Sequence, residues 1–308
     1  MSQRILITGS EGLVGTALRT ALETHGRDVS GLDLVAADHE LGDVRDHERV
    51  RAAVEGCDGI VHLAAVSRVI WGERDPELCW ATNVGGLRNV VEAMEARRHK
   101  PWLIFASSRE VYGQPDRLPA TEEMPVQPVN IYGRSKVEGE RLVQAARDRG
   151  LRASTVRLSN VYGSVQDHID RVVPAFARAA VLGATLRVEG AGHTFDFTHV
   201  DDTVRGLAAL IDLLVSGEAA PPPIHFLTGR PTTLGQLASL AVDIAGTSAP
   251  IEEGPQRSFD VSHFYGVPER ARQLLGWEPR VGLRIGLERL IQEYRRRLVV
   301  VEQEGARP

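Results

Sequence analysis

The stretch from Ile5 to Leu18, which reads ILITGSEGLVGTAL, constrains the fold of this chain more than any other. A short apolar run of β-forming residues meets a cluster of glycines, and an amphipathic run follows without a break. This pattern predicts a strand, a tight turn and the first turns of a helix. Gly9, Gly12 and Gly15 stand at the spacing G-x-x-G-x-x-G. Glycines so spaced allow the turn, let the backbone approach a pyrophosphate and let the helix pack against the strand.

Asp33 lies 18 positions after Gly15, near the end of a second β-type run over residues 28–34. An acid at this point typically binds a ribose of a dinucleotide whose phosphates face the helix N-terminus. The other interpretation is a plain turn residue, and the glycines in register favour ribose binding. Because a carboxylate would repel a 2′-phosphate, we expect NAD rather than NADP. The predicted cofactor contacts in this unit are Gly9, Glu11, Gly12, Leu13, Gly15 and Asp33.

The composition is that of an ordinary globular protein, with 43% hydrophobic and 25% charged residues among 308. The net charge of -5 provides no basic surface for nucleic acid, so we expect no such partner. Cys57 and Cys79 lack metal-ligand spacing, which predicts no metal site and favours a reducing cytoplasm. The chain enters a strand at once and has no apolar run near the roughly 20 residues of a membrane span. We therefore expect neither a signal peptide nor a membrane contact.

Strand-like and helix-like runs alternate through the first half of the chain. The predicted strands cover residues 4–8, 28–32, 59–62, 102–107 and 152–158, and the predicted helices cover 13–25, 47–55, 76–98 and 132–149. This order implies right-handed crossovers and an α/β fold, namely a Rossmann-type doubly wound parallel sheet.

After residue 161 the alternation loosens. Helices are predicted over 176–182, 200–214, 233–245, 268–275 and 286–298, and strands over 185–188 and 224–227. We expect an NAD-binding domain over 1–165, to which 194–225 returns, and a smaller mixed α/β substrate domain over 166–193 and 226–308.

Tyr132 and Lys136 are four residues apart on a predicted helix, so their side chains share one face. A free tyrosine has a pKa of about 10 and is a poor base at neutral pH. A nearby ammonium group favours the phenolate, which lets the pair move the proton of a sugar hydroxyl while hydride leaves the carbon. The alternative is an exposed tyrosine beside a solvated lysine on the helix surface.

Further short motifs follow one another along the chain. They are Thr8-Gly9-x-x-Gly12-x-x-Gly15, Asp33, Gly42-Asp43-Val44, His62-Leu63-Ala64-Ala65, Asn83-Val84-Gly85-Gly86, Ser107-Ser108 with Val111-Tyr112-Gly113, Tyr132-x-x-x-Lys136, and Arg157-Leu158-Ser159-Asn160-Val161-Tyr162-Gly163. In this order, over roughly residues 4–297, they resemble the extended short-chain dehydrogenase/reductase family, in its NAD-dependent nucleotide-sugar epimerase/dehydratase branch.

The resemblance implies a role for each matching position. Tyr132 would be the general base and acid, Lys136 would bind the nicotinamide ribose and tune Tyr132, and Ser108 would hydrogen-bond the reacting hydroxyl. Further cofactor contacts would come from Asp43, Val44, Leu63, Ala64, Ala65, Asn83, Ser107, Tyr132 and Lys136. Substrate contacts would come from Ser108, Arg109, Glu110, Asn160 and Arg257, the last two on the diphosphate.

The chain departs from the family pattern at two places. Many relatives have an arginine before the Asp-Phe of the segment that matches Asp196-Phe197, and here Phe195 stands there. One phosphate contact is thereby lost, for which Arg171 or Arg187 would be the substitutes.

The second departure is Arg109-Glu110, where dehydratases of the branch carry Asp-Glu and decarboxylases carry a glutamate at the second position. The missing acid argues against 4,6-dehydration. Glu110 is open to two interpretations, a functional acid or an exposed loop acid.

The sequence as a whole predicts an NAD-dependent nucleotide-sugar 4-epimerase that acts through a transient 4-keto sugar. The alternatives are a reductase, decarboxylase or dehydrogenase of the same family, or a non-catalytic dinucleotide-binding regulator. The family also implies a homodimer built on the helices predicted over 76–98 and 132–149.

Overall fold

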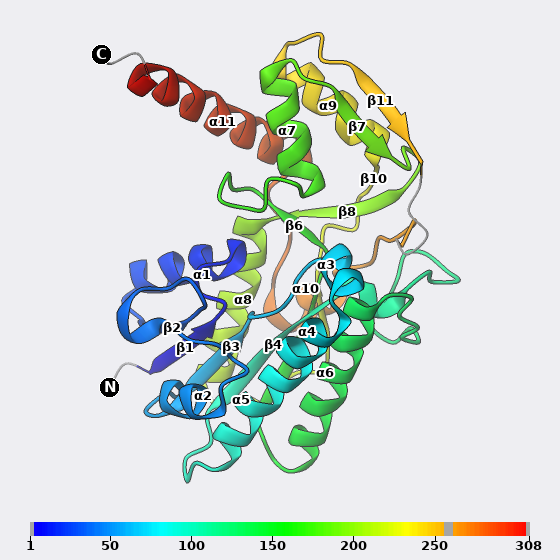
Figure 1. Ribbon diagram of the computed structural model, residues 1–308. Coiled ribbons are helices and arrows are strands. Elements are labelled where there is room, and N and C mark those ends of the chain that lie inside the picture. The colour runs from blue at the N-terminus through cyan, green and yellow to red at the C-terminus, as the bar shows by residue number, and fades with distance from the viewer. Residues whose placement is uncertain (1–2, 256–260, 306–308) are drawn as a thin grey trace.

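The computed structural model describes residues 3–255 and 261–305. Its main sheet contains six strands in the order β2-β1-β3-β4-β5-β9 (Figure 1), and every neighbouring pair is parallel. The strands are β1 (Arg4–Thr8), β2 (Asp28–Leu32), β3 (Gly59–His62), β4 (Trp102–Ser108), β5 (Ala153–Leu158) and β9 (Ile224–Phe226). The predicted α/β class and doubly wound parallel sheet are confirmed.

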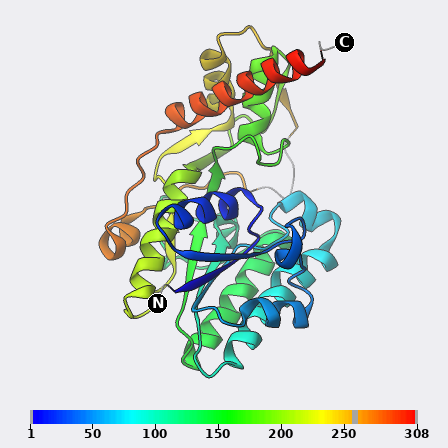
Figure 2. The same cartoon turned by 90° about the vertical axis from the view of Figure 1, so that its left-hand side faces the viewer.

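Helices cover both faces of this sheet (Figures 1 and 2), namely α1 (Leu13–Thr24), α2 (His47–Val54), α5 (Gly86–Glu95), α6 (Ile131–Asp148), α8 (Val200–Val215) and α10 (Glu269–Leu275). Alternate side chains of each strand enter separate cores. Ile5 and Ile7 of β1 pack with α1 and α8, whereas Leu6 faces the core formed with α2, α5 and α6. The central strand β1 therefore reads as a nearly continuous apolar run, as expected of a strand buried on both faces.

The order of the strands decides where a ligand can bind. The chain runs from β1 to β2 on one side and then crosses back to β3 on the other side of β1. At such a reversal the loops after β1 and β3 diverge and leave a crevice at the carboxyl ends of the strands. β4 ends beside this crevice, and α6 begins there after a long connection.

The helix predicted over 76–98 is present with an irregular middle. It consists of α4 (Pro76–Trp80), one π turn, η2 (Ala81–Gly85), and α5. Asp75 caps its start by accepting a 2.9 Å hydrogen bond from the backbone nitrogen of Leu78. A short helix that was not predicted, α3 (Val69–Arg74), comes before it.

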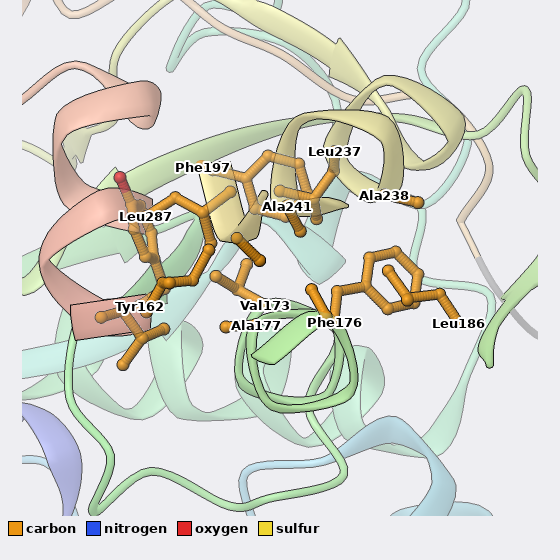
Figure 3. Packing of buried hydrophobic residues seen from close by; sticks show 14 of the residues in the cluster. Tyr162, Val173, Phe176, Ala177, Leu186, Phe197, Leu237, Ala238, Ala241 and Leu287 are labelled. Atoms are coloured by element: carbon orange, nitrogen blue, oxygen red, sulfur yellow. The ribbon is translucent and has the colours of Figure 1, made fainter. Parts of the chain in front are cut away.

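The rest of the chain forms a second region to one side of the main sheet (Figure 2). Its elements are β6 (Asn160–Tyr162), α7 (Val172–Leu182), β7 (Leu186–Glu189), β8 (Thr194–His199), β10 (Pro231–Thr233), α9 (Leu234–Ala245), β11 (Ile251–Gly254) and α11 (Leu283–Gly305). Val173 and Phe176 of α7 pack against Leu237 and Ala241 of α9 and Leu287 of α11 (Figure 3). This region therefore has a hydrophobic core of its own.

The sequence did not predict β6, β8, β10 or β11. These strands are three to six residues long, and they pair in the sheets β10-β8-β6 and β11-β7. Their partners are remote in sequence, as when Asn160 of β6 lies opposite Phe197 of β8. Runs of three or four residues, as in β6, β10 and β11, carry little periodicity, so only tertiary pairing identifies them.

Within residues 3–255 and 261–305, no helix combines the length and the apolar character needed to cross a membrane. Over the same residues, no group of three or more His, Cys, Asp or Glu side chains is arranged to hold a metal ion. Cys57 and Cys79 are both buried free thiols.

Candidate active site

Close backbone contacts shape the glycine turn after β1. A Cβ on Gly9, whose φ is +75°, would lie 2.7 Å from the amide nitrogen of Ala64. A Cβ on Gly15 would lie 2.1 Å from the carbonyl oxygen of Gly9, so packing itself requires glycine at both positions. At Gly12, the N-cap of α1, the nearest such atom is 3.4 Å away. Packing does not explain this third glycine, and the open space beside it fits a pyrophosphate at the helix N-terminus.

Asp33 turns its carboxylate toward the same turn. Oδ2 accepts a 3.1 Å hydrogen bond from the backbone nitrogen of Glu11, and Oδ1 accepts one of the same length from Val35. The predicted acid and the predicted glycine turn are thus in contact, although 22 residues separate Glu11 from Asp33. This arrangement fits the ribose and pyrophosphate of one dinucleotide.

Asn83 holds the segment that follows β3. From the π turn, its Oδ1 accepts a 2.7 Å bond from the backbone nitrogen of Val66, and its Nδ2 donates to the Val66 carbonyl at 3.2 Å. The same Nδ2 donates to Ser135 Oγ of α6 at 2.9 Å. Asn83 therefore fixes the predicted cofactor segment 63–65 relative to the helix that carries Tyr132. A π turn at such a point is a common feature of functional sites.

Asp43 and Val44 lie on the α2 side of the sheet. Both carboxylate oxygens of Asp43 accept hydrogen bonds from Arg45, and this pairing lowers the pKa of Asp43. Val44 is buried, and a Cβ on Gly86 of α5 would lie 2.6 Å from its Cγ2. Their contact with an adenine stays a prediction.

The three predicted catalytic residues meet where β4 ends and α6 begins. Tyr132 is 9% exposed and Lys136 is 3% exposed, which excludes the interpretation of a surface pair. The ammonium of Lys136 donates a 2.8 Å bond to the Ala106 carbonyl and lies 5.8 Å from the centre of the Tyr132 ring. Ser108, the last residue of β4, lies close enough to the Tyr132 side chain to affect its pKa.

Burial shifts both pKa values of the Tyr132–Lys136 pair toward the uncharged forms. It raises the pKa of Tyr132 to about 12, against the opposing effects of the Ser108 hydrogen bond and of the Arg171 charge. It lowers the pKa of Lys136 to about 8. The expectation of a depressed pKa for Tyr132 is therefore wrong for the protein alone, because loss of solvation outweighs the lowering effects of Ser108 and Arg171.

A buried ionic network supports the end of β4. Ser107 Oγ donates a 2.6 Å bond to Glu140 of α6, and Arg157 of β5 forms a two-pronged bridge to the same carboxylate at 2.9 and 2.7 Å. The paired charges and the fork geometry make this a rigid link between two strands and α6. The sequence analysis missed Glu140, although its position one turn after Lys136 on the same helix was a usable signal.

Arg109 and Glu110 begin the short 3-10 turn η3 (Arg109–Tyr112) directly after Ser108. Glu110 is 5% exposed, so the interpretation of an exposed loop acid is wrong. Its Oε1 lies 2.8 Å from Nη2 of Arg109, and its Oε2 accepts a 2.8 Å bond from Nδ2 of Asn130, the N-cap of α6. The guanidinium carbon of Arg109 lies 4.5 Å from the centre of the Phe195 ring.

The remaining predicted substrate residues are placed differently. Asn160 begins β6, and its buried Nδ2 has no hydrogen-bond partner. Arg171, the N-cap of α7, lies close enough to Tyr132 to affect its pKa, whereas Arg187 is exposed on β7. Arg257 lies outside the described residues. Of the two arginines expected to replace the missing cation at position 195, the fold therefore brings Arg171 toward Tyr132.

Comparison with known proteins identifies the family. The description "NAD dependent epimerase/dehydratase family" matches residues 5–222. The chain belongs to this family. Its cofactor is accordingly NAD, as the glycine turn and Asp33 predicted, and the resemblance drawn from the motifs is confirmed.

Members of the family with different activities are about equally similar to this chain. A UDP-glucose 4-epimerase of Corynebacterium glutamicum is 30% identical over 302 residues, covering 90% of this chain and 91% of that protein. UDP-glucuronic acid decarboxylase 1 of Danio rerio is also 30% identical, over 96% of this chain and 73% of its own length. The structure of MoeE5 in complex with UDP-glucuronic acid and NAD superposes with a TM-score of 0.88 at 26% identity, over 96% and 99% of the two chains. The family and cofactor follow from these matches, and the reaction has to be argued from the site.

Proposed function

We propose that this protein is an NAD-dependent nucleotide-sugar 4-epimerase in which Tyr132 is the acid and base. The observation that carries the proposal is the joint burial of Ser108, Tyr132 and Lys136 where β4 meets α6, beside the glycine turn. A regulator that only holds a dinucleotide has no use for a buried lysine, whose desolvation is costly. The shared ancestry with a UDP-glucose 4-epimerase supports the same reaction type.

In this mechanism the side chains move one proton and hold one hydroxyl. Bound NAD supplies a reversible acceptor for the hydride of C4 of the sugar. Tyr132 Oη takes the proton of the C4 hydroxyl as the C4–H bond breaks, while Ser108 hydrogen-bonds the same oxygen. The resulting 4-keto sugar rotates in the site, so that the C4–H bond is restored on the opposite face of C4. Tyr132 then returns the proton to the C4 oxygen. The Lys136 ammonium, oriented by the Ala106 carbonyl, favours the phenolate during the transfer.

The proposal includes the substrate and the assembly. The relatives' names support a UDP-sugar, with Asn160 and Arg257 on its diphosphate. We propose a homodimer through α4, α5 and α6, since Leu78 and Trp80 leave apolar surface exposed on α4. A cytoplasmic location and the division into an NAD-binding and a smaller substrate domain belong to the same proposal.

A decarboxylase is the second candidate, and Glu110 is the observation that favours it. This carboxylate is buried and close enough to Tyr132 to raise the pKa of the phenol. An acid there could serve a second proton transfer once a 4-keto sugar has formed.

The test uses the purified chain with NAD and a set of UDP-, dTDP- and GDP-linked sugars, followed by proton NMR. The expected result is inversion at C4 with no net NADH and no release of CO2. Release of CO2 from a uronic acid would replace the proposal with the decarboxylase, and stoichiometric NADH would replace it with a dehydrogenase. Tight binding of NAD without chemical change in any sugar would replace the proposal with a non-catalytic dinucleotide-binding regulator.

A further inference from the structure

Arg109 is a buried cation for which the mechanism above has no role. It is 9% exposed, and its guanidinium carbon lies 4.5 Å from the centre of the Phe195 ring and 5.9 Å from that of the Phe264 ring. Both distances allow cation–π attraction. The rings supply no acceptor oxygen, so the N–H groups of the guanidinium need other partners.

Only some of the hydrogen-bond donors of the Arg109 guanidinium have a partner within the protein. Nη2 contacts Glu110 Oε1 at 2.8 Å, whereas the buried Nη1 has no hydrogen-bond partner. The other Glu110 oxygen accepts a bond from Asn130, and neither oxygen bonds Nη1 of Arg109. A buried donor without a partner costs about 1–3 kcal/mol, which a ligand would relieve. The arrangement is therefore half of a two-pronged anion site.

The position of Arg109 decides which part of a substrate it can meet. It follows Ser108 directly in sequence, and Ser108 lies close enough to the Tyr132 side chain to affect its pKa. Its partner Glu110 is bonded to the cap of α6 two residues before Tyr132, and a Cβ on Gly133 in the first turn of α6 would lie 2.6 Å from the Glu110 carbonyl oxygen. Arg109 is thus anchored beside the reacting hydroxyl, where the sugar ring has to lie.

We propose that Arg109 binds a carboxylate carried by the sugar ring, so that the preferred substrate is a nucleotide-diphosphate uronic acid. The inference rests on the proposed function only in placing the sugar beside Tyr132. A guanidinium is the side chain best suited to a planar carboxylate, which it meets through two parallel N–H···O bonds. Lys136 and Arg171 add positive charge near the same site and offset Glu110.

The test measures binding rather than turnover. Isothermal titration calorimetry on the NAD-loaded protein compares UDP, UDP-glucose and UDP-glucuronic acid as ligands, for the wild type and for Arg109→Gln, Arg109→Lys and Arg284→Gln. Arg284 is the matched control, because its bridge to Asp243 is exposed on both sides. The wild type should bind UDP-glucuronic acid about 10- to 100-fold more tightly than UDP-glucose, the usual value of one charge-assisted contact.

In Arg109→Gln this preference should disappear, in Arg109→Lys it should be retained in part, and in Arg284→Gln it should be unchanged. Binding of UDP alone should be the same in all four proteins. An equal loss for all three ligands in Arg109→Gln would overturn the inference and assign Arg109 to the diphosphate. If the wild type did not prefer UDP-glucuronic acid to UDP-glucose, the inference would be overturned, and Arg109 would serve only in its ion pair with Glu110.

The inference and the proposed function fail separately. A clear preference for UDP-glucuronic acid together with an unchanged C4 configuration would contradict the epimerase and support the carboxylate site. Inversion of UDP-glucose at C4 with no preference for UDP-glucuronic acid would support the epimerase and contradict the carboxylate site.

Discussion

The main sheet and the second region differ in how their chemistry is encoded. In the main sheet, Gly9, Gly15 and Asp33 are fixed by local geometry, and their roles can be read from spacing within 30 residues. In the second region, the role we assign to Phe195 is its contact with the guanidinium of Arg109, a residue 86 positions away in the chain. The features of the main sheet are therefore encoded in local sequence patterns, whereas those of the second region depend on contacts between distant segments. The predictions below test this separation.

The largest expected effect is the loss of activity in Tyr132→Phe. General acid–base groups contribute about 100- to 10,000-fold, and we expect a fall in kcat of that size. Tyr294→Phe in α11 makes the same chemical change at a buried hydroxyl that has no hydrogen-bond partner. Full activity in the control and residual activity below 1-in-100 in Tyr132→Phe, both by NMR assay, would sustain the assignment. Comparable activity in the two variants would refute it.

The second prediction concerns stability in the second region. Leu237→Ala removes a fully buried side chain from the core of α7, α9 and α11 and should lower the free energy of unfolding by about 2–5 kcal/mol. The exposed Leu182→Ala should change it by less than about 0.5 kcal/mol. Chemical denaturation measures both values. NAD affinity, measured by calorimetry well below the melting temperature, should be unaltered, and a parallel loss would show that the two cores are not independent.

The third prediction concerns the cofactor cradle. In Gly15→Ala the new Cβ would overlap the Gly9 carbonyl, which lies only 2.1 Å away, so the turn has to move. Overpacking of this kind costs about 1–3 kcal/mol, and we expect NAD affinity to fall about 10-fold or more. Gly192→Ala in the second region has open space around the Cβ and should bind NAD normally. Equal affinity in the two variants would contradict the account of the glycine turn.

The smallest expected effect concerns the ionisation of Lys136. Lys136 and the exposed Lys100 are the two lysines of the chain, so ¹³Cε-lysine NMR should give two signals. Because burial lowers the pKa of Lys136 to about 8, one signal should titrate near that pH. The folded state then releases this proton before the unfolded chain does, so unfolding free energy should rise between pH 8 and 10.5 relative to Lys136→Met. A flat difference over this range would place the lysine in solvent.

The sequence predicted most of the main sheet and less of the second region, for physical reasons. The positions of all six strands of the parallel sheet were predicted to within about one residue. The signal is clearest in strands such as β1 and β4, which are buried on both faces and contain apolar runs between turns. β8 reads Thr194-Phe195-Asp196-Phe197-Thr198-His199, and its alternation of polar and apolar residues was a usable strand signal that the sequence analysis missed. What the sequence does not show is that Asp196, Thr198 and His199 are buried as well.

The same limit applies to the site. Tyr132 and Lys136 share one helix, so spacing alone brings them together. The stacking of Arg109 on Phe195 and the bond between Glu110 and Asn130 arise from the packing of η3 against β8 and α6. Neither contact has a local signature in the sequence. The departures from the family pattern at Phe195 and at Arg109-Glu110 were therefore visible in the sequence, but the contact between Phe195 and Arg109 was not.

The most direct test of the central claim follows the hydrogen at C4. UDP-sugars deuterated at C4, one with a glucose and one with a glucuronic acid head group, are incubated with the NAD-loaded protein and analysed by NMR and mass spectrometry. The account predicts products inverted at C4 that keep their deuterium, because the hydride leaves and returns without contact with water. Inversion with deuterium replaced by solvent hydrogen, or no inversion of either sugar, would contradict it.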